Sequence, residues 1–438
     1  MVRTEYYKDL TKMNTFGMKV KARCFIEYDS VADLVDIEFE ELARPVLHIG
    51  GGSNLLFTDD FKGTVLHSKI NFIEILDECQ RDGMSSDSES EDCHSSACAP
   101  VTSSMVDRAS NCHFDRASNC HFDRAERVEK SPQIVLVSVG AGVVFDDFCE
   151  WAAKEGLWGV ENLSYIPGEV GASAVQNIGA YGVEVKDVIK TVYCYDTVEE
   201  EFVHFDVEDL DYGYRDSAFK DPEIKGRYIV THVVFALSRT PQPKLDYGHL
   251  RDAVASAYGE SRGGGYHPHV TSPDDMNCHN DQASQELTPG LIRKVIIKIR
   301  KEKLPEPSVM GSAGSFFKNP VISVEHFARI EAAAKAEFGA DYNVPHYVIP
   351  SSPSVIPSEA EGRVEESLIK IPAAWLIEQC GWKGKRSGGA AVYDKQPLVI
   401  VNYTGEAYPE EIVSLERRIM DSVKRKFDVE LHPEVEHI

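Results

Sequence analysis

The chain has 438 residues, of which 42% are hydrophobic and 27% are charged, values close to those of ordinary globular proteins. This length predicts two or three domains rather than one compact core. With 46 Lys and Arg against 71 Asp and Glu, the net charge is −25, which argues against a general nucleic-acid or anionic-membrane binder. An anionic ligand therefore needs a local basic pocket. Neither a signal peptide nor a membrane span of ~20 apolar residues is evident, so we expect a cytoplasmic protein that does not insert into membranes.

The first chemical signal is a glycine loop. A strand-like run at residues 46–49 leads directly into Gly50-Gly51-Gly52-Ser53-Asn54, where backbone N–H groups are open to a phosphate because no Cβ obstructs them. The Gly-Lys-Ser/Thr ending of a P-loop and the Gly-x-Gly-x-x-Gly spacing of a dinucleotide fingerprint are both missing. A phosphate-cradling loop and an ordinary turn both remain open.

Residues 79–130 interrupt the globular pattern, since they are rich in Ser, Asp, Glu and Cys and poor in aliphatic residues. Residues 107–114 are repeated without change as residues 115–122, a period too short for a solenoid. The paired Cys and His of the repeat invite a zinc site, but no hydrophobic frame organises them, and we expect no metal. Residues 263–285 and 350–366 also have the composition of surface insertions.

The ordered parts predict a mixed α/β fold. Strands are expected at residues 134–139, 228–237 and 398–401, and helices with one apolar face follow residues 145, 323 and 409. Gly140-Ala141-Gly142 lies between a strand and a helix, but Phe145 stands where a Rossmann fingerprint needs its third glycine. We therefore predict that the chain has no Rossmann unit.

Three polar residues attract attention without being decisive. Arg215, between aromatic and acidic neighbours, suits a bidentate clamp on a carboxylate or a surface pair with Asp216. Ser315 lies on a glycine-flexed turn beside two phenylalanines, which fits a dry site or an ordinary turn. Glu434 follows a proline in a strand-like run, as either a site carboxylate or an edge charge. Farther back, residues 166–182 are dense in Gly, Ser, Asn and Gln and suit backbone-mediated binding of a large cofactor.

Taken in order, these motifs resemble the UDP-N-acetylenolpyruvoylglucosamine reductase family, also called UDP-N-acetylmuramate dehydrogenases, in the subgroup with a tyrosine loop over the substrate. The resemblance covers nearly all of the chain outside the three insertion-like stretches. Its motifs are Asn14-Thr15-Phe16-Gly17, the glycine loop, Ile166-Pro167-Gly168, Gln176-Asn177-Ile178-Gly179-Ala180-Tyr181-Gly182, Gly213-Tyr214-Arg215-Asp216-Ser217, Leu245-Asp246-Tyr247-Gly248, Gly314-Ser315-Phe316-Phe317-Lys318-Asn319-Pro320, Ala374-Trp375-Leu376-Ile377-Glu378-Gln379-Cys380, Gly388-Gly389-Ala390-Ala391-Val392 and His432-Pro433-Glu434-Val435.

The resemblance implies an FAD-binding domain of the vanillyl-alcohol-oxidase type in two subdomains, followed by an α+β substrate-binding domain. The expected division is residues 1–72, an insertion at residues 73–133, residues 134–240 and residues 241–438. It implies an NADPH-dependent flavoenzyme of peptidoglycan precursor synthesis, acting on small molecules and most simply a monomer. By the same resemblance, hydride is expected to pass from flavin N5 to C3 of the enolpyruvyl group, and Ser315 is expected to give a proton to C2 while Arg215 and Glu434 stabilise the intermediate.

The same resemblance implies two sets of binding residues. Substrate contacts are expected from Tyr214, Tyr247, Lys303 and Asn319, and FAD contacts from Gly50, Gly52, Ser53, Asn54, Gly168, Ser173, Asn177 and Gly182. Two alternatives remain open. One is a flavin oxidase of the same fold, since fold alone does not fix the electron acceptor. The other is an inactive binding protein disrupted by its insertions.

Deleting residues 107–122 should leave turnover intact. A surface insertion adds little beyond closure entropy, about 0.6 kcal/mol per doubling of loop length. A reductase assay on the deletion protein checks this, and loss of folding would show that the repeat is structural.

Overall fold

We analysed a computed structural model of the chain, which describes residues 1–78, 133–261, 287–349 and 368–438. The Cys/His repeat and the expected insertions at residues 263–285 and 350–366 lie outside the described residues. Within the described ranges no helix combines the length and apolar composition that a membrane crossing requires.

The first sheet has four strands in the order β1-β2-β5-β3 and contains the strand expected at residues 46–49. β5 pairs in parallel with both β2 and β3, while β1 runs antiparallel along the outer edge. The Ser30 side chain caps the short helix that follows β2. The elements are β1 (Arg3–Asp9), β2 (Lys21–Tyr28), α1 (Val31–Val35), β3 (Val46–Ile49), β4 (Leu55–Leu56) and β5 (Phe61–Ser68).

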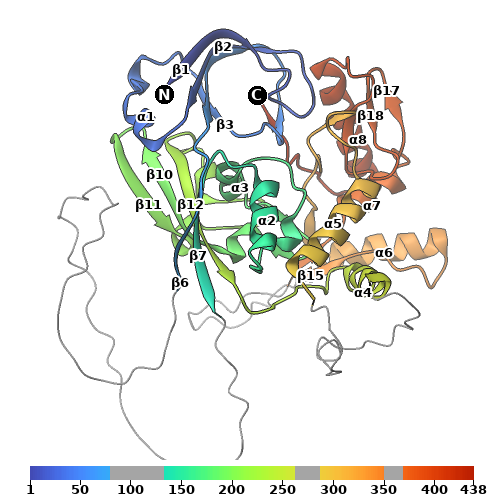
Figure 1. Cartoon of the computed structure of the whole chain (residues 1–438). Coiled ribbons are helices and arrows are strands. Elements are labelled where there is room, and N and C mark those ends of the chain that lie inside the picture. The colour runs from blue at the N-terminus through green and yellow to red at the C-terminus, as the bar shows by residue number, and fades with distance from the viewer. Residues whose placement is uncertain (79–132, 262–286, 350–367) are drawn as a thin grey trace, which may run out of the picture.

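The second sheet has five antiparallel strands in the order β11-β10-β12-β7-β6. Figure 1 shows it below the first sheet, with α2 and α3 against one face. Apolar residues of β7 and β12 form one core with Phe145 and Phe148 of α2, which confirms the expected strands and helix. The elements are β6 (Ile73–Glu78), β7 (Ile134–Gly140), α2 (Phe145–Lys154), α3 (Val170–Gln176), β10 (Ile189–Asp196), β11 (Glu201–Asp206) and β12 (Tyr228–Ser238).

One predicted boundary is wrong. The sequence placed Ile73–Glu78 in the insertion, but these residues form β6 and pair with β7. The expected boundary at residue 73 came from the family resemblance, whereas the unusual composition begins only at residue 79; backbone pairing with β7 decides the structure of the residues between them. The second sheet therefore begins before the insertion and continues after it.

The glycines that resembled a Rossmann loop serve close packing. A Cβ on Gly140 would stand 2.5 Å from the carbonyl oxygen of Ile70, and one on Gly142 would stand 2.6 Å from that of Ser68. The Gly142 N–H donates to the Ile70 carbonyl at 2.9 Å. These glycines bring the two sheets together, and the segment has no free backbone for a nucleotide.

The carboxyl-terminal half has two small sheets and five helices in its described part. α4 and α5 pack against each other and against Trp158, which lies next to the second sheet. α6, α7 and α8 lie to the side of both large sheets (Figure 1). The elements are α4 (Leu250–Ser261), α5 (Pro289–Lys303), β13 (Gly311–Ser312), β14 (Val321–Ser323), α6 (Val324–Phe338), β15 (Tyr347–Ile349), β16 (Leu368–Lys370), α7 (Ala373–Gln379), β17 (Arg386–Ser387), β18 (Ala390–Val392), β19 (Ile400–Asn402) and α8 (Pro409–Phe427).

The end of the chain returns to its beginning. β20 (Glu436–His437) pairs in parallel with β4, directly after the glycine loop, and Figure 1 shows the carboxyl terminus beside the first sheet. One hydrophobic core includes Phe16 and Phe57 from the start of the chain and Phe316 and Leu415 from its second half. The strand expected to carry Glu434 is thus tied to the loop expected to bind a phosphate.

A matched pair of glycine variants tests the glycine loop. Gly52 has φ +60°, and an added Cβ would stand 1.9 Å from the Met13 carbonyl oxygen; Gly156 has φ +70° with open space around it. Gly52→Ala should lower the free energy of unfolding by at least about 3 kcal/mol, from strain and overlap together, and Gly156→Ala by about 1 kcal/mol from strain alone. Urea unfolding measures both, and equal losses would contradict the close approach.

Candidate active site

The glycine loop faces a second backbone segment across the two large sheets. An added Cβ on Gly51 would lie 3.4 Å from the Cα of Gly168, and the Ser53 hydroxyl donates to the Pro167 carbonyl at 3.0 Å. Gly168 itself has φ +121°, a conformation that favours glycine. Two of the predicted cofactor segments therefore lie side by side.

The facing segments fit a large phosphate-bearing cofactor. The side chains nearest to Gly50 are those of Ala172 and Glu169, whose Cβ and Oε2 lie 3.1 Å and 3.3 Å from an ideal Cβ, so this place is lined by one small residue and one carboxylate. Nearby, the buried amide nitrogen of Gln176 has no hydrogen-bond partner within the described residues. Backbone N–H groups and an unused donor are what an anionic cofactor with many acceptors requires.

Two residues predicted to contact the cofactor have their side chains engaged by the protein. The Ser173 hydroxyl donates to the Val170 carbonyl at 2.7 Å. The Asn177 amide nitrogen donates to the Gly213 carbonyl at 2.6 Å and to Glu184 at 3.1 Å, while its side-chain oxygen accepts from the Lys186 backbone at 3.3 Å. Asn177 ends α3 in the left-handed conformation, φ 47°. Its side chain thus holds neighbouring loops rather than a ligand.

Arg215 is fixed from several sides. Its Nε lies 3.0 Å from Oε1 of Glu434, and its two terminal nitrogens donate to the carbonyls of Asn177, at 3.2 Å, and Gly179. Gly179 has to be glycine here because a Cβ would stand 2.8 Å from the guanidinium. Arg215 therefore pairs with the side chain of Glu434 and not with Asp216, the alternative surface partner.

Glu434 is held by its backbone between two predicted site segments. Its N–H donates to the Phe316 carbonyl at 2.8 Å, and its own carbonyl accepts from the Asn54 side chain at 3.0 Å. Burial raises the pKa of the Glu434 carboxyl, and the charges of Arg215 and two lysines oppose that rise. The carboxyl group is therefore poised to take a proton more readily than a surface glutamate.

Ser315 lies beside this pair. The next residue, Phe316, receives the Glu434 N–H and donates its own N–H to the Leu398 carbonyl at 2.8 Å. Gly314, with φ +70°, turns the chain just before the serine. Ser315 is exposed, and its hydroxyl makes no hydrogen bond within the described residues. The structure thus places the segment that contains Ser315 against the backbone of Glu434, which is paired with Arg215.

Of the four predicted substrate residues, two are in contact. The Asn319 amide donates to the Tyr214 hydroxyl at 3.3 Å, and Lys370 lies 3.9 Å from the centre of the Tyr214 ring. Tyr247 is 44% exposed and lies beside Gly182, where an added Cβ would stand 3.5 Å from the Tyr247 Cβ and 3.8 Å from its ring carbon Cδ2. Lys303 is the exposed last residue of α5 and makes no ion pair with another described residue.

The basic side chains near the pair include residues that the sequence did not single out. Lys220 donates to the Arg215 carbonyl at 2.9 Å, and burial lowers its pKa, as does the charge of Lys318. Burial also lowers the pKa of Arg300, whose Nε donates to the Tyr165 carbonyl at 3.1 Å. Lys318 lay within a recognised motif, whereas Lys220 and Arg300 gave no local signal. Together they supply positive charge in a chain of net charge −25.

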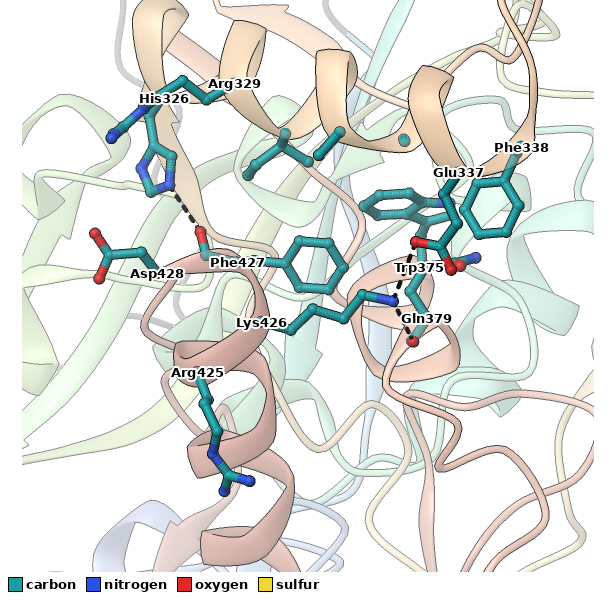
Figure 2. A pocket seen from close by; sticks show the side chains of 13 residues that line it. His326, Arg329, Glu337, Phe338, Trp375, Gln379, Arg425, Lys426, Phe427 and Asp428 are labelled. Atoms are coloured by element: carbon teal, nitrogen blue, oxygen red, sulfur yellow. Dashed lines mark hydrogen bonds and ion pairs between the residues drawn. The ribbon is translucent and has the colours of Figure 1, made fainter.

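A separate cavity of about 250 Å³ lies between α6, α7 and the end of α8 (Figure 2). Its polar groups are engaged with one another: Lys426 donates to the Gln379 carbonyl at 3.0 Å and lies 3.6 Å from Glu337, and His326 bonds to the Phe427 carbonyl at 2.9 Å. None of the predicted site residues lines it, so it is not the candidate active site. The described residues contain no cluster of three or more His, Cys, Asp or Glu suited to a metal ion.

Known proteins are similar to this chain over nearly all of its length. Residues 306–438 match the family described as UDP-N-acetylenolpyruvoylglucosamine reductase, C-terminal domain, and residues 121–204 match an FAD binding domain. The chain is 39% identical over 430 residues to UDP-N-acetylenolpyruvoylglucosamine reductase of Bacteroides fragilis, covering 98% of each chain. It is 35% identical over 442 residues to the Porphyromonas gingivalis protein of that name, covering 100% of this chain and 99% of the other. The crystal structure of the Thermus caldophilus reductase shares the fold, with a TM-score of 0.52 and 19% identity over 100% of this chain and 98% of that one.

The Arg215–Glu434 pair should show energetic coupling. In a double-mutant cycle of Arg215→Met and Glu434→Gln, each single change leaves the other group buried without its partner, and the double change removes both. Urea unfolding at pH 7 should give a coupling energy of about 2 kcal/mol. Additive losses would show that the pair is not formed.

Proposed function

This chain belongs to the UDP-N-acetylenolpyruvoylglucosamine reductase family, and from that premise we propose that Ser315 is the proton donor of its reaction. The protein is an FAD-dependent oxidoreductase, a UDP-N-acetylmuramate dehydrogenase of peptidoglycan precursor synthesis that uses NADPH. The observation that carries the proposal is the Arg215–Glu434 ion pair, with 3.0 Å between Nε and Oε1. The backbone of Glu434 is hydrogen-bonded to Phe316, the residue that follows Ser315.

The cofactor is assigned to the backbone between the two large sheets. FAD, when bound, supplies a hydride from N5 to C3 of the enolpyruvyl group. The open backbone of the glycine loop and the small residues opposite it support this location. We keep the domain division expected from the sequence, except that β6 is assigned to the second FAD-binding subdomain. The proposed contacts are Gly50, Gly52, Ser53, Asn54, Gly168, Ser173, Asn177 and Gly182, with Ser173 and Asn177 acting through their backbone.

Arg215 and Glu434 are proposed to stabilise negative charge that develops on the substrate carboxylate. Two backbone carbonyls and the Glu434 carboxylate hold the guanidinium, so its orientation is fixed before substrate arrives. Burial raises the pKa of Glu434. A raised pKa favours a protonated Glu434 carboxyl, which can share its proton with the substrate carboxylate as negative charge develops there. The pair thereby stabilises an anion without moving.

Ser315 is proposed to give its proton to C2. A serine hydroxyl is a weak acid in water, so it needs neighbouring cations to stabilise the alkoxide. The sequence suggested Arg215 or Lys303 for this role. The charges of Lys220 and Lys318 both lower the pKa of Glu434. These two lysines are therefore better supported as the neighbouring cations than the exposed Lys303.

Substrate positioning is assigned to Tyr214, Tyr247, Lys303 and Asn319. The hydrogen bond between Asn319 and Tyr214, and the Lys370 ammonium over the Tyr214 ring, support a site that combines an aromatic surface with positive charge. Such a site suits the base and pyrophosphate of a nucleotide. The Tyr247 ring packs against Tyr181 and stacks on Tyr347, and Lys303 is assigned from the family motif.

A Ser315→Ala variant should separate the two half-reactions. NADPH should still bleach the flavin at the normal rate, because no hydroxyl is required there. Reoxidation by the enolpyruvyl sugar nucleotide should slow by about 10²–10⁴-fold, the usual contribution of a general acid. Stopped-flow absorbance of the flavin measures both steps.

Ser308→Ala is the matched control, because Ser308 is also exposed and lies in the loop before this segment. It should leave both half-reactions unchanged. Reoxidation of Ser315→Ala at the normal rate would remove Ser315 as the proton donor.

A further inference from the structure

Tyr165 has an uncommon backbone conformation at the start of a predicted cofactor segment. It comes directly before Ile166-Pro167-Gly168, which we call the cofactor segment, and has φ +62°. The left-handed region is unfavourable for a bulky residue, which keeps this conformation only where its surroundings hold it there. The contacts that hold Tyr165 therefore decide where the cofactor segment begins.

Both backbone polar groups of Tyr165 are bound by side chains of two helices that pack against each other, α2 and α5. The Tyr165 N–H donates to Oδ1 of Asp146 on α2 at 2.5 Å, and its carbonyl accepts from Nε of Arg300 on α5 at 3.1 Å. Asp146 is also paired with Arg293 of α5, with 3.0 Å between Oδ2 and Nη2. α5 thus holds the Tyr165 backbone directly through one arginine and indirectly through another.

The Tyr165 side chain makes a further contact with the chain beyond α5. Its hydroxyl donates to Oε2 of Glu306 at 2.5 Å. This hydrogen bond, together with burial and the charge of Glu306, raises the pKa of Tyr165 to about 12, so the hydroxyl keeps its proton and can donate at neutral pH. The ammonium of Lys301 lies 5.2 Å from the centre of the ring and holds it from a second side.

Glu306 begins the segment that leads to Ser315, residues 306–315, which we call the serine segment. The Glu306 carbonyl closes a turn by accepting two backbone N–H groups at 2.9 Å each. The Ser312 N–H then donates to the Thr15 carbonyl at 2.9 Å, where β13 pairs with β19. Ser315 follows three residues later. The serine segment is therefore fixed along its length, and the bond from Tyr165 sets the position of the cofactor segment against it.

We propose that Tyr165 is a positioning residue that holds the cofactor segment and the serine segment in one arrangement. It acts through the backbone of residues 166–168 on one side and through Glu306 on the other. Flavin reduction by NADPH requires alignment of two rings, whereas reoxidation requires hydride transfer to C3 and proton transfer from Ser315 to C2 in a single geometry. The inference rests on the proposed FAD site and on the proposed role of Ser315, and it adds a residue on which the second half-reaction depends.

Tyr165→Phe tests the proposal, because it removes only the hydroxyl and keeps the ring and the backbone contacts. Stopped-flow absorbance should show flavin reduction by saturating NADPH at the native rate. Reoxidation by the saturating sugar nucleotide should slow by at least about fivefold, since small misplacements at a distance slow a step that needs a fixed geometry. A purely structural role would lower the stability of the protein or slow both half-reactions alike.

Hydrogen–deuterium exchange supplies a readout that does not involve turnover. Mass spectrometry of the resting protein should show the backbone amides of residues 165–171 exchanging at least about threefold faster in Tyr165→Phe than in the native protein, because the cofactor segment opens more often when one of its ties is removed.

Glu306 variants show whether the two residues act through their hydrogen bond. Glu306→Ala should have the same effects on reoxidation and exchange as Tyr165→Phe. Glu306→Gln, whose amide oxygen still accepts a hydrogen bond, should have smaller effects. The Tyr165→Phe/Glu306→Ala double variant should be no slower than either single variant, and additive losses would show that the bond is not the link.

Tyr6→Phe is the matched control, because Tyr6 is 70% exposed on β1, and both of its half-reactions and its exchange should equal those of the native protein. Reoxidation of Tyr165→Phe at the native rate, or equal slowing of both half-reactions, would overturn the role of Tyr165 alone. Reoxidation of Ser315→Ala at the native rate would instead overturn the proton donor on which the inference rests.

Discussion

The ion pair between Arg215 and Glu434 is the interaction on which the rest of the site depends. Its two side chains are only 17% and 13% exposed, and removing one partner of a buried pair is strongly unfavourable, by roughly 3–5 kcal/mol. The protein accordingly supports the pair from both sides. Arg215 has the left-handed conformation, φ 56°, and donates to two carbonyls of the segment that follows α3. Glu434 is tied by its backbone to Phe316 and Asn54.

These contacts explain why the two ends of the chain meet. The last strand returns to β4 directly after the glycine loop, and this return places a carboxylate between the cofactor segment and the serine segment. Asn54, predicted as a cofactor residue, holds that strand through its side chain. A residue predicted to contact the cofactor and a residue of the predicted catalytic set are thus joined by one hydrogen bond.

The local sequence was sufficient to predict the strands and helices whose apolar residues recur at a regular spacing. The strand at β7 and the helix at α2 followed from apolar residues at strand and helix spacing. β6 was missed because the boundary at residue 73 was taken from the family resemblance, and its structure depends on pairing with β7. The family motifs identified Ser315, Arg215 and Glu434, but composition alone left each of them between a site and an ordinary surface residue.

The remaining features depend on contacts between residues that are distant in the sequence. Tyr165 and Glu306 are 141 residues apart, and no local pattern marks either of them. Asn177 lay in a recognised motif, yet its side chain holds protein loops rather than offering a contact to FAD. Lys220 was missed for the same reason as Tyr165, since only folding brings its ammonium to the Arg215 carbonyl.

A reductase of this family needs the enolpyruvyl sugar nucleotide as its electron acceptor. NADPH oxidation by the purified yellow protein, measured in air with and without that nucleotide, tests this most directly. Rapid oxidation is expected only when the sugar nucleotide is present. Equal turnover with oxygen alone would contradict it and would make the protein an oxidase of the same fold.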